Sequence, residues 1–164
     1  MNGTNLYTTD VNAPKGFRPA SLEEIMVGAR RTLSNRIRKG TELSSPQRTR
    51  DYLMARLATR EYETFTLIYL DNRHRLIACE DLFRGAIDGA SVHPREVVKL
   101  ALAKNAAAIL LAHPHPSGVA EPSQADELIT QRLKEALSLI DVRVLDHLVI
   151  AGGDVISMAE KGLI

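Results

Sequence analysis

Apolar residues in the first part of the chain follow the spacing of amphipathic helices. One stripe repeats with a period close to 3.6 residues and consists of Leu22, Ile25, Met26, Ala29, Leu33 and Ile37. Ser21 and Glu24 form a capping-box pattern before this stripe, and Lys39-Gly40 follows it, so we expect a helix over residues 21–38. A second helix is predicted from Ser45-Pro46 to about Arg60, with the proline at its first helical position.

After residue 63 the pattern changes to short apolar runs separated by turn residues, which indicates strands. Strands are predicted at residues 65–70, 75–79, 82–87, 106–112, 142–151 and 155–157. Residues 106–112 are apolar throughout, as in a central strand that is covered on both faces. Further helices are predicted from Pro94 to Asn105 and from Ser123 onward. The expected fold class is α+β, with a central mixed β-sheet packed against helices.

Length and composition add limits to this picture. The chain has 164 residues, enough for one domain with a sizeable core, and its single cysteine, Cys79, excludes an internal disulfide. Residues 1–20 have little periodic apolar content, so we expect a flexible leader and no secretory signal. No apolar run is long enough to span a membrane. These features predict a cytoplasmic protein.

The charge is distributed unevenly along the chain. Residues 1–50 carry nine lysines and arginines against four acidic residues, a net charge of +5, whereas the remainder carries −4. A basic helix over residues 21–44 is compatible with nucleic-acid binding, but such a charge run is more often only a solvated face. No DNA-reading motif and no interleaved aromatic residues accompany it, so the nucleic-acid interpretation has weak support.

One short stretch concentrates residues with metal-binding chemistry. His113 and His115 are two positions apart at the end of an apolar strand, so both imidazoles point to the same side. Pro114 and Pro116 stiffen this segment, and Asp126 follows in the first turn of the next helix. Two imidazoles and one carboxylate are a usual ligand set for catalytic zinc, which keeps a further position open. The pattern predicts one zinc ion per chain.

Each part of this pattern also has a structural explanation. Ser123 and Asp126 have the spacing of a helix-capping motif, with the acid favoured by the helix dipole. The two histidines would then be a hydrogen-bonded pair. His147, beside Asp146 in a predicted strand, is expected to be a hydrogen-bonded structural histidine and not a ligand.

The same residues resemble a known family. His-x-His-Pro followed by Ser-x-x-Asp resembles the JAMM motif of the JAB/MPN superfamily, and the longer match resembles its RadC-like branch. The similarity spans about residues 45–164 and is carried by residues 92–96, 105–108, 113–126, 146–150 and 157–163. Pro114 stands where that branch usually has asparagine. The resemblance implies a cytidine-deaminase-like architecture for the domain.

The resemblance also implies roles for residues that the pattern alone does not select. Glu61, Glu63 and Glu80 are candidates for the general base, and the family position two residues before the strand phenylalanine selects Glu63. In the family, the serine that corresponds to Ser123 donates a hydrogen bond to the oxyanion of the reaction. The implied activity is that of a zinc metallopeptidase or isopeptidase, with His113, His115 and Asp126 as the metal ligands.

Two other function classes stay open. Relatives without an intact motif act as scaffolds, so a non-catalytic metal-binding or protein-interaction module is an alternative. The historical name of the branch suggests a DNA-repair accessory, although the first 40-odd residues lack the glycine-containing hairpin expected for DNA binding. The partner that this activity implies is a protein or peptide substrate, which the sequence does not identify.

Overall fold

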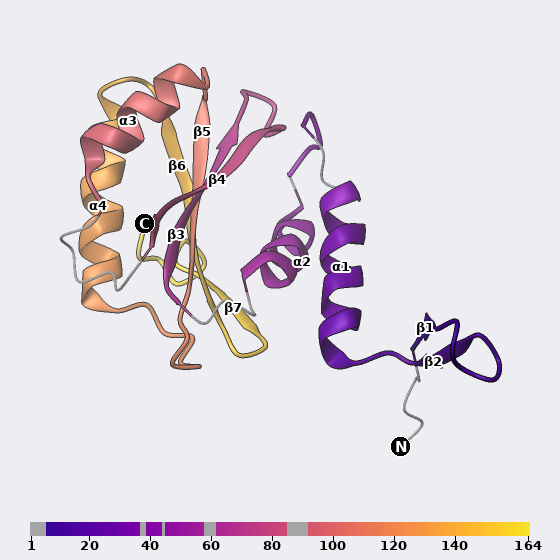
Figure 1. Ribbon diagram of the computed structural model, residues 1–164. Helices are drawn as coiled ribbons and strands as arrows, with labels where there is room; N and C mark the ends of the chain where they lie inside the picture. Colours follow the sequence, from indigo (N-terminus) through magenta and orange to yellow (C-terminus); the bar gives the residue numbers. More distant parts are fainter. Residues whose placement is uncertain (1–5, 37–38, 44, 58–61, 85–91) are drawn as a thin grey trace.

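A computed structural model gives the structure of residues 6–36, 39–43, 45–57, 62–84 and 92–164. Its centre is a five-stranded sheet with the strand order β4-β3-β5-β6-β7 (Figure 1). The strands are β3 (Thr64–Leu70), β4 (Leu76–Arg84), β5 (Ala108–Pro114), β6 (Arg143–Ala151) and β7 (Asp154–Ser157). β5 and β6 are parallel, and the other neighbouring pairs of this sheet are antiparallel. The α+β class and the mixed sheet predicted from the sequence are confirmed.

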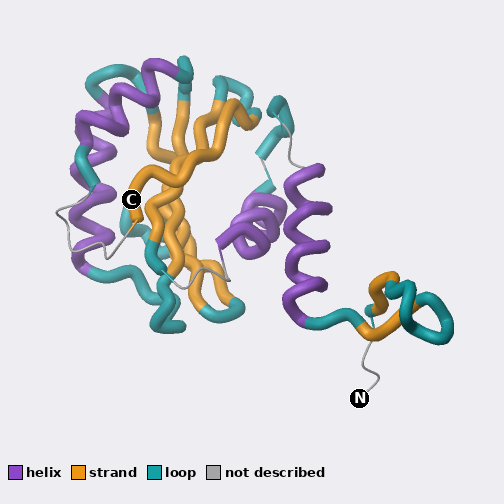
Figure 2. Tube along the Cα trace, in the orientation of Figure 1, coloured by secondary structure: helices purple, strands orange, loops and turns teal. Residues whose placement is uncertain are grey.

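Helices cover both faces of this sheet. On one face lie α3 (Pro94–Ala103) and α4 (Gln124–Ser138), and on the other lies α2 (Pro46–Leu57), with α1 (Leu22–Arg36) packed against α2 (Figure 2). None of the helices in the described ranges is both long enough and apolar enough to cross a membrane.

The two central strands divide their side chains between two hydrophobic cores. β3 and β5 are buried along their whole length, as a continuous apolar run predicts. One core lies against α3 and α4 and includes Phe65, Leu67, Tyr69, Ile109, Leu111, Ile129 and Leu133. The other lies against α2 and includes Leu53, Leu57, Ile68, Leu70, Ala108, Leu110 and Ala112. Because residues alternate along β5, His113 points to the α4 face.

The N-terminal region contains more structure than the sequence suggested. Within the expected leader, β1 (Tyr7–Thr9) and β2 (Phe17–Pro19) pair as an antiparallel hairpin that lies apart from the main sheet (Figure 1). Gly16 adopts a φ of 71°, and its N–H donates to the Ala13 oxygen, which closes the connection. The capping box at the start of α1 is present: Ser21 N donates to Glu24 Oε2 at 2.9 Å, and Glu24 N donates to Ser21 Oγ at 3.2 Å.

Two strand predictions need correction. The separate strands predicted at 75–79 and 82–87 are one continuous strand, β4, as far as residue 84, and residues 85–91 lie outside the described ranges. Glu80 and Asp81 lie between the two predicted strands, and they continue an edge strand in which Glu80 pairs with Lys104 and Asp81 accepts from Arg56. The predicted strand at 106–112 lies two residues further on, because β5 pairs with β6 as far as Pro114. His113 is therefore part of the sheet itself.

Candidate metal centre

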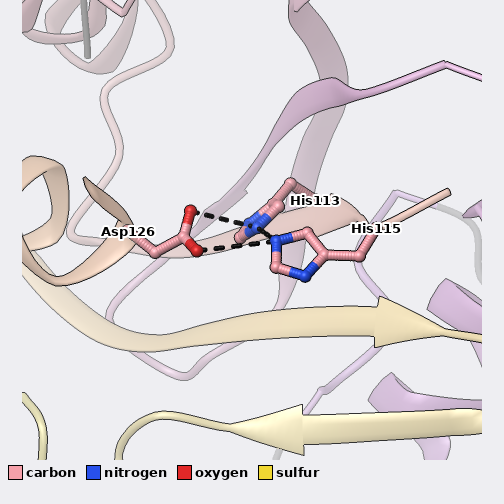
Figure 3. A group of neighbouring side chains, drawn as sticks. All are labelled: His113, His115 and Asp126. Atoms are coloured by element: carbon pink, nitrogen blue, oxygen red, sulfur yellow. Dashed lines mark hydrogen bonds and ion pairs between the residues drawn. The ribbon is translucent and has the colours of Figure 1, made fainter. Parts of the chain in front are cut away.

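The end of β5 and the beginning of α4 bring three side chains with metal-binding chemistry together. His113 is the next-to-last residue of β5, and His115 follows the strand. The chain then turns back through Gly118, and Asp126 occupies the first turn of α4. Because α4 packs on the face to which His113 points, the carboxylate of Asp126 reaches the two imidazoles (Figure 3).

The ligand atoms of these three residues converge on one point. The Nε2 atoms of His113 and His115 lie 2.7 Å apart. Asp126 Oδ1 lies 3.1 Å from His113 Nε2, and Asp126 Oδ2 lies 3.5 Å from His115 Nε2 (Figure 3). The side chains of His113 and Asp126 are 0% and 1% exposed, whereas that of His115 is 15% exposed. The cluster is therefore buried, with His115 on its open side.

This donor set fits a zinc ion. Zinc bonds to imidazole nitrogen and carboxylate oxygen are about 2.0–2.2 Å long, so tetrahedral ligand atoms lie about 3.3 Å from one another. The separations of 2.7, 3.1 and 3.5 Å lie on both sides of that value. His115 Nδ1 lies 2.9 Å from the main-chain oxygen of Val119, so that nitrogen donates and Nε2 is the ring atom that faces the other candidate ligands. The group could hold a metal ion.

Ser123 and Asp126 form the capping box that the sequence pattern allowed. Asp126 N donates to Ser123 Oγ at 3.2 Å, and Ser123 N donates to Asp126 Oδ2 at 2.7 Å. The Ser123 hydroxyl also donates to Asp126 Oδ2, at 2.6 Å. Oδ2 thus accepts two hydrogen bonds from Ser123, which leaves Oδ1 as the less engaged oxygen facing His113.

Burial and hydrogen bonding set the charge of this carboxylate. Desolvation favours the neutral acid, but the contact with the His113 ring and the hydrogen bonds from Ser123 outweigh it. Together they hold the pKa of Asp126 below its usual range. The Asp126 side chain is therefore an anion at neutral pH, as a metal ligand must be.

A second buried layer lies behind His113. Its Nδ1 lies 2.8 Å from Nε2 of His147 on β6, and Nδ1 of His147 lies 2.6 Å from Oγ1 of Thr130 on α4. The ring of Phe65 packs edge-on against His147 with 5.4 Å between centroids. Complete burial keeps the pKa of His147 well below its ordinary value, so this ring is neutral. The expectation that His147 is hydrogen-bonded is confirmed.

Thr130 is absent from every sequence-based prediction of this site. It lies one helical turn after Asp126, on the same face as the buried residues Ile129, Leu133 and Leu137. One sequence feature could have identified Thr130. It is a polar residue within an apolar helical stripe, four residues after a candidate ligand. Its polar atom requires a partner when it is buried, and here that partner belongs to the metal centre.

The three glutamates considered as general bases differ in position. Glu63 immediately precedes β3 and is half-buried. Phe65, two residues further on, stacks with His113 at 6.4 Å between centroids, so this end of β3 lies beside the candidate ligands. Glu80 lies on β4, which β3 separates from β5, and it pairs with Lys104 at 2.5 Å. Glu61 lies outside the described residues.

Known proteins resemble this chain over most of its length. Residues 43–163 match the family model of the RadC-like JAB domain. A UPF0758 protein of Nitrosococcus oceani is 59% identical over 143 residues, which are 87% of this chain and 64% of that protein. A UPF0758 protein of Methylibium petroleiphilum is 54% identical over 160 residues, which are 96% of this chain and 72% of that protein. The chain spans 64% of the length of the first of these curated relatives.

Proposed function

Because the chain belongs to the RadC-like JAB domain family, we propose that it is a zinc-dependent hydrolase that cleaves a peptide or isopeptide bond. The convergence of His113, His115 and Asp126, of which only His115 is partly exposed, carries this proposal. These residues would hold a single zinc ion, with a further position left for water or substrate. When bound, zinc would polarise an amide carbonyl and make water a competent nucleophile near neutral pH.

Glu63 is the residue we propose as general base. The antiparallel register pairs Thr66 with Ala112. If this register continued three residues further along each chain, it would bring Glu63 opposite His115. Glu63 and Phe65 have the same strand parity, and the Phe65 ring packs against His113, so Glu63 points to the same face. From there its carboxylate would take a proton from the attacking water and deliver it to the leaving amine.

Ser123 is proposed to stabilise the oxyanion, a role that competes with its place in the capping box. Its hydroxyl proton is directed to Asp126 Oδ2 at 2.6 Å. To donate to a substrate oxygen, the hydroxyl would have to rotate away from Asp126 while its oxygen still accepts from Asp126 N. The exposure of Ser123 leaves room for that rotation.

Zinc stoichiometry and amide hydrolysis, measured together, test this function. We expect about one zinc per chain, and turnover of a mixed library of peptides and isopeptide-linked peptides that stops when the metal is removed. Glu63→Gln should keep zinc and lose about 10²- to 10⁴-fold in turnover. Glu80→Gln removes a glutamate that is two strands from β5, and it is the matched control that should keep both properties.

The results separate the alternatives. Folded protein that takes up no zinc when zinc is offered would overturn the hydrolase proposal and favour a metal-free interaction module. Zinc-loaded protein in which Glu63→Gln matches the wild type would refute the role of Glu63. A DNA affinity that falls steeply with salt, without amide hydrolysis, would favour a DNA-repair accessory.

A further inference from the structure

We propose that Thr130 and His147 are positioning residues that fix the tautomer of His113, so that the lone pair of its Nε2 faces the metal. This inference rests on the proposed function in that it takes His113 as a metal ligand. It concerns two side chains that lie outside the histidine and aspartate cluster and that would not contact the ion. Their hydrogen bonds leave only one arrangement of protons.

We call the chain of hydrogen bonds from the Asp126 main-chain oxygen through Thr130 and His147 to His113 the relay. The direction in which its protons point is set at Thr130. Its Oγ1 lies 2.5 Å from the main-chain oxygen of Asp126, one turn earlier in α4. A carbonyl oxygen can only accept, so the single hydroxyl proton of Thr130 is used in this bond. Thr130 Oγ1 also lies 2.6 Å from Nδ1 of His147. Because Thr130 has no second proton to give, His147 Nδ1 must carry the proton and donate it.

The position of the proton on His147 in turn sets the position of the proton on His113. Complete burial of His147 disfavours a second proton on its imidazole, so its Nε2 has only a lone pair. This nitrogen lies 2.8 Å from Nδ1 of His113, which must therefore donate. With its proton at Nδ1, the ring of His113 presents Nε2 as the ligand atom, and this atom faces His115 and Asp126. Hydrogen bonding of the second ring nitrogen is how ligand histidines are commonly oriented.

The hydrogen bonds of the relay link three elements of the fold, α4, β6 and β5. The relay begins at the main-chain oxygen of Asp126 on α4 and passes through Thr130, which is also on α4. It then continues through His147 on β6 to His113 on β5. The lone pair of His113 Nε2 then faces Asp126 Oδ1, 3.1 Å away. Two of the three candidate ligands are thus held from behind by the same chain of hydrogen bonds. The third, His115, is oriented separately by the Val119 oxygen.

A bulge in β6 points the side chain of His147 toward Thr130 and His113. Ile109 pairs with Val144, but Leu110 pairs with Asp146, so β6 has one extra residue at this point. In a regular strand, His147 would lie on the face opposite Val144. The bulge restores His147 to the α4 face, where Val144 also packs. Asp146 secures the bulge by accepting from His147 N at 2.7 Å and from the Ser157 hydroxyl at 2.6 Å.

Two measurements test the relay. Long-range proton–nitrogen correlation spectra of ¹⁵N-labelled protein report which ring nitrogen of each histidine carries the proton, and competition with a chromophoric chelator gives zinc affinity. We expect His147 to be protonated at Nδ1 in metal-free and zinc-loaded protein alike. Thr130→Val should produce a mixture of His147 tautomers and weaken zinc binding about 10- to 100-fold. Thr130→Ser keeps the hydroxyl and should restore both.

A matched control comes from the opposite face of the sheet. Thr49 is buried in α2 and also directs its hydroxyl to the oxygen four residues earlier, at 3.4 Å from Ser45. Thr49→Val should therefore change neither the His147 tautomer nor the zinc affinity.

The relay and the proposed function fail in different ways. Wild-type His147 protonated at Nε2 would overturn the relay even if zinc binds tightly, and this result requires no variant to fold. A Thr130→Val protein with unchanged tautomer and affinity would overturn it as well. Wild type that binds no zinc, but has His147 protonated at Nδ1, would contradict the proposed function and support the relay as a structural device.

Discussion

Nδ1 of His115 lies 2.9 Å from the main-chain oxygen of Val119, so the ring of this candidate ligand is held by the loop that follows it. The loop closes tightly, since Gly118 N donates to the His115 oxygen at 3.1 Å and Gly118 has a φ of 79°. The orientation of the most exposed ligand therefore depends on a backbone conformation that L side chains rarely adopt.

Gly118→Ala is expected to weaken zinc binding by up to about 30-fold, because an alanine in this conformation costs about 1–2 kcal/mol. An added Cβ meets no atom within 4 Å at either Gly118 or Gly153, but only Gly118 has a positive φ. Gly153→Ala is therefore the matched control for backbone strain. Equal zinc affinities of the two variants, measured by chelator competition, would show that the loop does not orient His115.

Ser123→Ala separates the two roles of this hydroxyl. Loss of the cap should cost about 1 kcal/mol of stability and weaken zinc binding, because Asp126 loses one of its orienting bonds. At saturating zinc, a remaining loss of about 10²-fold in turnover would support an oxyanion role. Turnover equal to the wild type would contradict that role. Ser21→Ala removes the corresponding cap of α1 and should leave zinc affinity unchanged.

Zinc should stabilise the folded chain by mass action. At a free zinc concentration about 100 times the Kd, the free energy of unfolding should rise by about 2.7 kcal/mol. Denaturant titrations with and without a chelator measure this gain. His115→Ala should abolish the gain with little effect on the metal-free protein, since the ring is partly exposed. An equal gain in His115→Ala would place the zinc elsewhere on the protein.

The turn between β3 and β4 should produce an acid-sensitive contribution to stability. A hydrogen bond from the Arg75 side chain, helped by the main-chain N–H groups of Arg75 and Arg73, lowers the pKa of Asp71 from 3.8 to about 2. A lowered folded-state pKa stabilises the protein above the unfolded value and ceases to do so as the pH falls through about 2. The stability difference between wild type and Asp71→Asn should therefore be constant above about pH 4 and vanish near pH 2. A difference that persists at pH 2 would contradict this assignment.

The sequence predicted those parts of the site that are local in the chain. His113, His115 and Asp126 lie within fourteen consecutive residues, and strand alternation followed by a helix start is sufficient to bring them together. The central strand of the sheet could also be predicted, since an apolar run such as residues 106–112 indicates a strand with two buried faces. The capping boxes at Ser21 and Ser123 are also local patterns, and both are present.

Features that depend on contacts between distant segments were not predicted. The β4 strand continues through Glu80 and Asp81 because these side chains are paired with Lys104 and Arg56. No local sequence pattern indicates these two contacts. The bulge that turns His147 toward His113 depends on the register between β5 and β6. The contribution of Thr130 becomes visible only when the ring of His147 is placed next to it.

The two layers of the metal centre also differ in how much chain must be ordered before each can form. The ligand cluster closes when α4 folds back on the end of β5, whereas the relay must wait for β6, since His147 lies 34 residues after His113. Shorter loops close at a lower entropic cost. During folding, we therefore expect a nascent β5–α4 unit to bind zinc weakly before the sheet is complete. Docking of β6 would then convert this early, rapidly exchanging complex into a tightly held one.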